Sequence, residues 1–227
     1  MADWFIATEG VKVVKDSASL WPQIITAVSS IGAAMGGVAL THRFTLKREE
    51  AAAKEELASE RLFIATELII ILEQYAEECA AVAGDDGEPI FEPNQQVERA
   101  PIAGYPVPLN FETVTGDWRS LPALLMFRIR ELPLLRVEAM RAIDVALECD
   151  FSRDYRYFFR ERQFRFARMG LKAIHLARQL RRDCRLPHSR LNESTWSAQP
   201  VMLNVLRRER KLRYKEAKEY DLLIRSY

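Results

Sequence analysis

The stretch "LWPQIITAVSSIGAAMGGVALT", residues 20–41, contains no charged side chain, and the basic sequence "HRFTLKR" follows it directly. As an α-helix, these residues would extend roughly 33 Å, enough to cross a hydrocarbon core of about 30 Å. Trp21 lies where an indole ring favours the membrane interface, and Pro22 lies in the first turn, which tolerates proline. We therefore expect a single transmembrane helix at residues 20–42, preceded by a short N-terminal tail at residues 1–19.

Small residues line one side of this predicted helix. Gly32 and Gly36 form a Gly-x-x-x-Gly motif one turn apart, and Ala33 and Gly37 form a second small pair beside them. In lipid, such ridges let two helix backbones approach closely, and packing drives their association. In water, each glycine inside a helix costs about 1 kcal/mol relative to alanine. The pattern therefore predicts that copies of the chain associate through these four residues into a homo-oligomer.

Two other interpretations of the uncharged stretch compete with the membrane span. A signal peptide begins with basic residues, whereas "MADWFIATEG" at residues 1–10 is acidic and the apolar run starts only at residue 20. The other interpretation is a helix buried in protein. In that alternative the chain is a soluble, oligomeric helical protein, and residues 20–41 pack inside the oligomer.

The residues that flank the stretch predict its orientation. The flank that follows it carries four basic residues, which are Arg43, Lys47, Arg48 and Lys54. The flank before it carries only Lys12 and Lys15, with Asp16 beside them. The positive-inside rule then predicts an N-terminus outside the membrane and a cytoplasmic domain at residues 43–227. The cysteines are too few and too widely spaced for a disulfide framework, which favours a reducing compartment; they are Cys79, Cys149 and Cys184.

Residues 43–227 indicate an all-α domain with one long connection. No proline or glycine occurs from residue 45 to residue 83, which predicts a helix that begins as a polar stalk. Residues 84–120 are rich in proline and glycine and predict a long loop whose apolar residues lie along the helices. Further helices are expected at about 121–147, 152–185 and 200–224. The expected fold is a transmembrane helix that continues into a cytoplasmic bundle of four or five helices, with no strands.

Individual residues predict further details of these helices. Ser120 is a candidate N-cap for the helix at 121–147, and Pro133 is expected to bend or break that helix. On the first helix, apolar residues recur at helical spacing along one broad face. They are Leu57, Leu62, Ile64, Ala65, Leu68, Ile69, Ile71, Leu72, Tyr75, Ala76, Cys79 and Val82. A short coiled coil between two copies is an option here, although the face is broad for a two-stranded seam.

Charge is distributed unevenly along a chain whose net charge is only +1. Residues 44–100 hold five basic and fourteen acidic residues, and residues 151–190 hold twelve basic and three acidic residues. In "FSRDYRYFFRERQFRFARMG", residues 151–170, arginines alternate with aromatic residues. The aromatic and apolar residues fall near one helical face, which indicates a core stripe. Pairing of the arginines with acidic residues of the first helix would then explain both charged segments.

Two external partners for the basic residues remain as alternatives. An anionic membrane surface would attract basic residues near the cytoplasmic leaflet. The candidates for this contact are Arg43, Lys47, Arg48, Arg156 and Arg160. Nucleic acid is the less favoured partner, and a basic helix at 152–185 would bind it. An unidentified protein partner is the third expectation, and exposed Trp118 or Trp196 would supply its contact surface.

The sequence does not indicate an enzyme. No glycine-rich phosphate loop, Gly-x-Ser-x-Gly elbow or His-Glu-x-x-His motif is present. His175, Cys184 and His188 lie near one another in sequence, but their spacing is not typical of a metal site. We therefore expect no catalytic residues, no cofactor and no metal, and a function based on interaction. The alternative is an enzyme whose site forms only in the folded chain, beneath the proline-rich loop.

Overall fold

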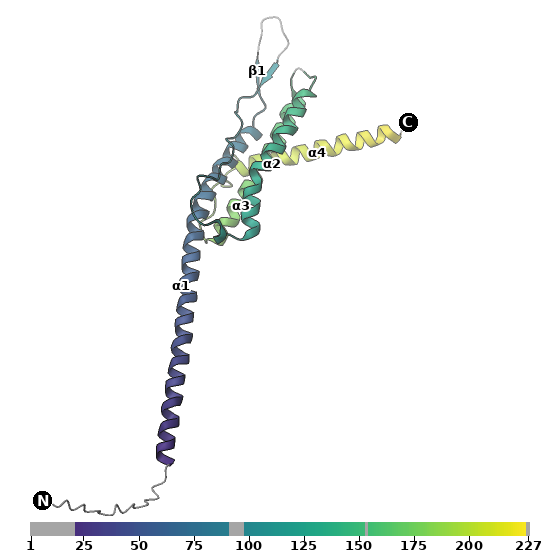
Figure 1. The fold of residues 1–227 in the computed structure, drawn as a ribbon. Helices are drawn as coiled ribbons and strands as arrows, with labels where there is room; N and C mark the ends of the chain where they lie inside the picture. The colour runs from purple at the N-terminus through teal and green to yellow at the C-terminus, as the bar shows by residue number, and fades with distance from the viewer. Residues whose placement is uncertain (1–20, 91–97, 153, 226–227) are drawn as a thin grey trace, which may run out of the picture. The chain divides into compact units, whose positions relative to one another are not determined.

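The computed structural model describes residues 21–90, 98–152 and 154–225, and its description of side chains begins at residue 41 and omits residue 98. Within these ranges the chain forms four α-helices: α1 (Trp21–Ala83), α2 (Ala123–Glu148), α3 (Arg156–Asp183) and α4 (Ala198–Arg225). Two short strands, β1 (Glu88–Ile90) and β2 (Glu98–Ala100), and a 3₁₀ helix, η1 (Trp118–Ser120), lie between α1 and α2. The predicted all-α class is confirmed (Figure 1).

The chain divides into two compact units, residues 1–54 and 55–227, and α1 contributes to both. In the first unit, the described side chains from Thr41 to Lys54 are exposed. The predicted small-residue ridge of Gly32, Ala33, Gly36 and Gly37 lies outside the residues whose side chains are described. Over the described part of the chain, no helix combines the length and the apolar character needed to cross a membrane.

In the second unit, the predicted apolar face of α1 is confirmed from Ile64 onward. Its members from Ile64 to Val82 are buried, except for Ile71, which is half-buried. Leu57 and Leu62 were expected on this face, but both are exposed. The bundle begins only near Arg61, whose side chain donates a 2.7 Å hydrogen bond to the carbonyl of Ser120. From Glu55 to Glu60, the side chains of α1 are all exposed.

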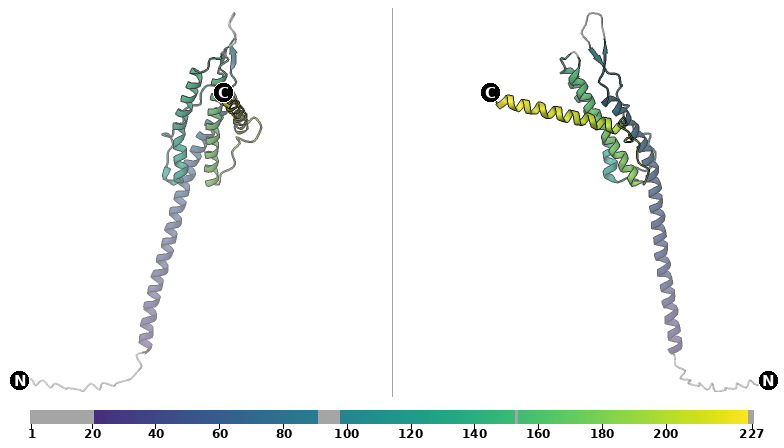
Figure 2. Two further views of the ribbon diagram at one scale, coloured as in Figure 1. Left: turned by 90° about the vertical axis from the view of Figure 1, so that its right-hand side faces the viewer. Right: turned by 180° about the vertical axis from the view of Figure 1, so that it is seen from behind.

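Helices α2 and α3 form a hairpin joined by residues 149–155 and lie side by side (Figures 1 and 2). Asp150, in the connection, accepts hydrogen bonds from the backbone N–H groups of Ser152 and Phe158, at 3.0 and 2.9 Å, and so caps the start of α3. Pro133 lies inside α2, which continues unbroken to Glu148. The prediction for Ser120 is wrong: it ends η1, and Pro122 occupies the N-cap position of α2.

Helix α3 is the central element of the second unit, and its predicted core stripe is confirmed. Phe159, Phe166, Met169, Ile174, Ala177 and Leu180 are all buried, whereas Tyr155, also expected in the stripe, is half-buried and lies just before the helix. Gly170 marks the closest approach of three helices, because a Cβ added there would lie 2.8 Å from Cβ of Cys79 on α1 and would overlap Sδ of Met202 on α4. The absence of a side chain at this position therefore allows α1, α3 and α4 to meet.

The long connection from residue 84 to residue 120 contains a small hairpin, contrary to the expectation of a chain without strands. β1 and β2 pair antiparallel, with Glu88 opposite Ala100 and Ile90 opposite Glu98. The pairing uses backbone groups, and all three side chains of β1 are exposed, so no alternation of apolar residues marks the strand. As predicted, part of the connection lies along the helices: Leu109 is buried and Phe111 packs on the core, whereas Ile102 and Val107 are exposed.

Charge pairing within the chain is confirmed, but with a wider set of partners than predicted. Arg181 on α3 binds Glu73 on α1 through two hydrogen bonds of 2.8 and 2.9 Å, as expected for an acidic first helix. Two other arginines of α3 pair with carboxylates outside α1. Arg162 pairs with Asp85 at 2.8 Å, and Arg160 pairs with both Glu209 and Glu216 on α4.

Candidate functional site

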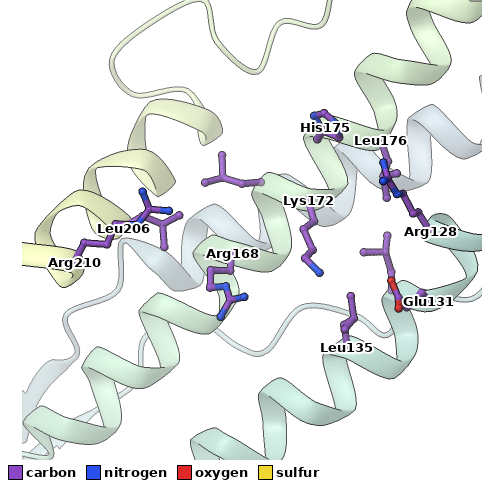
Figure 3. Close-up of a pocket in the computed structure, with 11 residues that line it drawn as sticks. Arg128, Glu131, Leu135, Arg168, Lys172, His175, Leu176, Leu206 and Arg210 are labelled. Carbon is purple, nitrogen blue, oxygen red and sulfur yellow. The ribbon is translucent and has the colours of Figure 1, made fainter. Parts of the chain in front are cut away.

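A groove of about 410 Å³ opens between α2, α3 and α4, and we call it the basic groove (Figure 3). Its apolar floor is formed by five leucines, which are Leu132, Leu135, Leu171, Leu176 and Leu206. Its rim is polar and mostly cationic, and it consists of Arg128, Glu131, Arg168, Lys172, His175 and Arg210. Binding sites between the helices of a bundle combine an apolar surface with polar groups, and this groove has both.

The polar side of the groove on α3 arises from helical periodicity. Arg168, Lys172 and His175 are spaced four and three residues apart, so they form one exposed stripe along the helix. The buried stripe of α3 faces the core, and the polar stripe therefore lies beside the space between α2 and α4. Figure 3 shows Lys172 extending from α3 toward α2, with Arg168 one turn along the helix.

The cations of the groove are not among the arginines that form ion pairs within the bundle. Arg160, Arg162, Arg165 and Arg181 each pair with a carboxylate of the same chain. In the described residues, Arg128, Arg168, Lys172 and Arg210 form no ion pair; Arg168 lies 5.6 Å from the ring of Phe164. Glu131 is the one carboxylate on the rim. The groove therefore has an excess of positive charge beside an apolar surface, which favours an anionic ligand with an apolar part.

A second, more polar recess of about 530 Å³ adjoins the groove at His175. Arg182 and His188 line this recess, together with Arg181, whose guanidinium is held by Glu73. His175 and His188, which are close in sequence, line the same recess, whereas Sγ of Cys184 lies 3.8 Å from the carbonyl oxygen of Arg61. Among the described residues, no group of three or more His, Cys, Asp or Glu side chains is arranged to hold a metal ion.

The structure does not bring the predicted anion-binding residues together in the groove. Arg43, Lys47 and Arg48 are exposed on α1 in the first unit. Arg156 is exposed and pairs with Asp154 at 3.2 Å, and Arg160 binds Glu216 at 2.7 Å. Both line a recess of mixed charge near the start of α3, away from the basic groove. These two arginines therefore have carboxylate partners within the chain.

The residues of the basic groove were not singled out as a site from the sequence. One signal for them was available, because Arg168, Lys172 and His175 repeat at helical spacing opposite the buried face of α3. Arg128 and Arg210 carry no such signal. They belong to other helices, and only the packing of α2 and α4 on α3 places them at the same groove.

The aromatic residues of α3 bear on the nucleic-acid alternative. Phe158, Phe159 and Phe166 are buried in the core, so their rings are not exposed for stacking on bases. Trp118 is half-buried, with its ring 6.0 Å from that of Phe111 and 4.4 Å from the guanidinium of Arg130. Trp196 is 88% exposed. Of the two tryptophans, Trp118 therefore anchors the long connection, and Trp196 is free to contact a partner.

No family model, curated protein sequence or solved structure matches the chain.

Proposed function

We propose that this protein is a single-pass membrane protein whose cytoplasmic helical bundle binds an acidic amphipathic helix of a protein partner in the basic groove. The observation that carries the proposal is the set of four cations, Arg128, Arg168, Lys172 and Arg210, which surround a leucine floor without a carboxylate partner in the described chain. The protein acts by interaction and not by catalysis.

A helix suits the shape and chemistry of the groove. Leu132 and Leu135 lie one turn apart on α2, and leucines of α3 and α4 add further apolar contacts to the floor. An amphipathic helix binds such a groove through apolar side chains at positions i, i+3 or i+4, and i+7. Acidic side chains beside that stripe would meet the cationic rim, and opposite charges would fix the orientation of the helix.

Residues 20–42 provide the membrane anchor in this proposal. The support is the uncharged run from residue 20 to residue 41, which is long enough for a span and is followed directly by basic residues. Arg43, Lys47 and Arg48 are exposed and would contact anionic lipid headgroups at the cytoplasmic surface. Gly32 and Gly36 would bring copies of the chain together within the membrane.

Binding in the groove is tested with a fluorescent synthetic helix that carries leucine at positions i, i+3 and i+7 and glutamate on both flanks. Anisotropy is measured with the full-length protein in detergent. We expect Arg168→Glu combined with Lys172→Glu to weaken binding at least about tenfold, which corresponds to about 1.4 kcal/mol. The control is Arg207→Glu combined with Lys211→Glu, which makes the same change in net charge at exposed positions outside the groove. If both variants lost the same binding affinity, the effect would depend on overall charge, and the groove would not be the binding site.

The anchor is tested separately by membrane fractionation. We expect the full-length protein to remain in the membrane pellet after alkaline carbonate extraction. Protease added from the cytoplasmic side is expected to digest residues 43–227 and to spare the anchor. Release into the supernatant would favour the soluble oligomeric alternative, and steeply salt-dependent retention on immobilised DNA or RNA would then support a nucleic-acid partner.

A further inference from the structure

Helix α4 has carboxylates on the side that meets α3. Arg160 of α3 pairs with Glu209 at 3.2 Å and with Glu216 at 2.7 Å. Arg213 of α4 lies on the same side, where it pairs with Glu161 of α3. Two of the four carboxylates in residues 207–225 are therefore held by ion pairs at the contact between α3 and α4.

The opposite side of α4 is basic and exposed. Positions 207, 211, 214, 218, 222 and 225 are spaced three or four residues apart and form one stripe along the helix, with position 215 beside it. We call this surface the cationic face of α4. Its seven side chains are all exposed, and they are Arg207, Lys211, Tyr214, Lys215, Lys218, Leu222 and Arg225. Figures 1 and 2 show α4 continuing beyond its contact with α3.

The cationic face has an excess of positive charge. Among the described residues, none of its five basic side chains forms an ion pair. The two remaining carboxylates lie along opposite edges of the face, because Glu219 follows Lys215 by one turn and Asp221 follows Tyr214 by two turns. Five cations thus stand against two carboxylates, so the complementary partner is an extended anionic surface.

We infer that the cationic face of α4 binds the anionic phospholipid headgroups of a membrane surface. Clusters of about four to eight basic residues on a helix attract anionic lipid, and each residue adds to the attraction. Tyr214 and Leu222, which are 72% and 59% exposed, suit the same ligand. A tyrosine ring favours the membrane interface, and a leucine beside basic residues inserts at the boundary of the acyl chains. Nucleic acid would offer phosphates to the cations but no apolar layer to Leu222.

This surface is separate from the basic groove. Leu206 and Arg210 are the residues of α4 that line the groove, and neither belongs to the cationic face. The inference goes beyond the groove and rests on the membrane location in the proposed function. In a chain anchored through residues 20–42, the cationic face stays close to the lipid, so contacts that are individually weak act together.

The test places an environment-sensitive fluorophore on the face through Leu222→Cys, in full-length protein that also carries Cys149→Ser to remove the exposed native thiol. The protein is reconstituted in vesicles of phosphatidylcholine, with or without phosphatidylserine, and the vesicles are collected by flotation. We expect the emission to shift to the blue only with phosphatidylserine and to return at high salt, because salt screens the attraction. The same fluorophore at Val137→Cys, exposed on α2, is the matched control and should show no such shift.

Neutralisation of the lysines identifies the contact. Lys211→Gln with Lys215→Gln and Lys218→Gln is expected to reduce the blue shift at least fivefold, while glutamine preserves the helix. The control removes three charges at exposed positions on other elements, through Arg119→Gln, Arg141→Gln and Arg190→Gln, and should keep the shift. A shift that survives loss of the lysines, or that decreases equally in the control, would overturn the inference.

Flotation separates this inference from the proposed function. Protein that floats with phosphatidylcholine alone has its anchor, and the absence of a phosphatidylserine-dependent shift in that protein overturns the inference and leaves the anchor standing. Protein that floats and shifts only with phosphatidylserine binds lipid through α4 but lacks the anchor, so the proposed membrane span falls instead. The synthetic-helix assay contains no anionic lipid and tests the groove alone. Retention on DNA or RNA through the same lysines, without a shift on vesicles, would make nucleic acid the ligand and overturn the inference.

Discussion

Arg162 on α3 donates a 2.8 Å hydrogen bond to Asp85, which lies just after the end of α1, and both side chains are almost completely buried. The same carboxylate accepts hydrogen bonds from the backbone N–H groups of Gly87, Ile102 and Ala103, at 2.9, 3.0 and 3.0 Å. Arg162 also donates to the carbonyl of Ala103. This pair therefore joins three segments, namely the end of α1, the long connection and the central helix.

Loss of the Asp85 carboxylate should destabilise the bundle strongly. Asp85→Ala would leave the Arg162 guanidinium buried without its counter-charge, so we expect the free energy of unfolding to fall by about 3–5 kcal/mol. Urea-induced unfolding of the full-length protein, followed by circular dichroism, measures the change. The control is Asp154→Ala, which breaks the exposed pair with Arg156 and is expected to cost about 1 kcal/mol or less. Equal costs for the two substitutions would contradict the role of burial.

The same carboxylate predicts a dependence of stability on pH. Burial acts to raise the pKa of Asp85, but the N–H groups of Ala103 and Gly87 and the Arg162 guanidinium outweigh it and hold the pKa below its ordinary value. The pKa of Asp85 is therefore lower in the folded state than in the unfolded state, where it is about 3.9. The ionised carboxylate contributes its full stabilisation above the unfolded-state pKa, and this stabilisation is lost as the pH falls through the folded-state pKa. We expect the urea midpoint to decrease between about pH 5 and about pH 3. Asp85→Asn should be less stable at pH 5 and should show a flatter pH profile.

Gly170→Ala should destabilise the junction of α1, α3 and α4. Alanine favours a helix over glycine by about 1 kcal/mol, but the added methyl group would overlap Cys79 and Met202. Overpacking of this kind costs about 1–3 kcal/mol, so we expect a net loss of stability. Gly104→Ala is the matched control, because no atom lies within 4 Å of a Cβ added there. A more stable Gly170→Ala variant would show that the three helices can separate at this point.

The three cysteines should react at different rates. Cys149 is exposed at the end of α2, Cys184 is half-buried, and Cys79 is buried in the core. Burial, the largest effect on Cys79, raises the pKa of its thiol, so its reactive thiolate is also scarce. With a chromogenic disulfide reagent, we expect Cys149 to react first and Cys79 to react only after denaturant is added. Cys149→Ser should abolish the fast phase, and a fast phase that survives this substitution would contradict the assignment.

Self-association in the membrane should depend on the small residues of the predicted span. Gly32→Ile combined with Gly36→Ile would separate the two helix backbones and is expected to weaken association without preventing insertion. A membrane-association reporter measures the first effect, and carbonate extraction measures the second. If dimer levels stay unchanged while the protein remains in the membrane, the Gly-x-x-x-Gly motif has no part in assembly.

Local signals account for the parts of the fold that were predicted well. Leu68, Tyr75 and Val82 on α1, and Phe159 and Phe166 on α3, recur at helical spacing and are buried as expected. Leu57 continues the same spacing and is exposed. Periodicity identifies a face that can be buried, but it does not show how far along the helix another element covers that face.

Two arginines of α3 show what neighbouring residues in the sequence do not predict. Arg160 and Arg168 lie two turns apart on α3 with similar neighbours, and the sequence suggested the former as a candidate for binding an anionic surface. In the fold, α4 brings Glu209 and Glu216 to Arg160, whereas no ion pair forms at Arg168 in the described chain. The crossing of α4 therefore decides which of the two cations is paired with carboxylates of the same chain.

The amino-acid sequence by itself determined the all-α class, the approximate extents of the helices and the long connection, because apolar periodicity and helix-breaking residues act over a few neighbouring positions. Only the tertiary structure decided the buried pair of Asp85 and Arg162, the charge balance of the basic groove and the exposure of residues 214–225 at the end of α4. These features depend on contacts between residues far apart in the chain, and a side chain's pairing and solvation follow from the elements that fold against it.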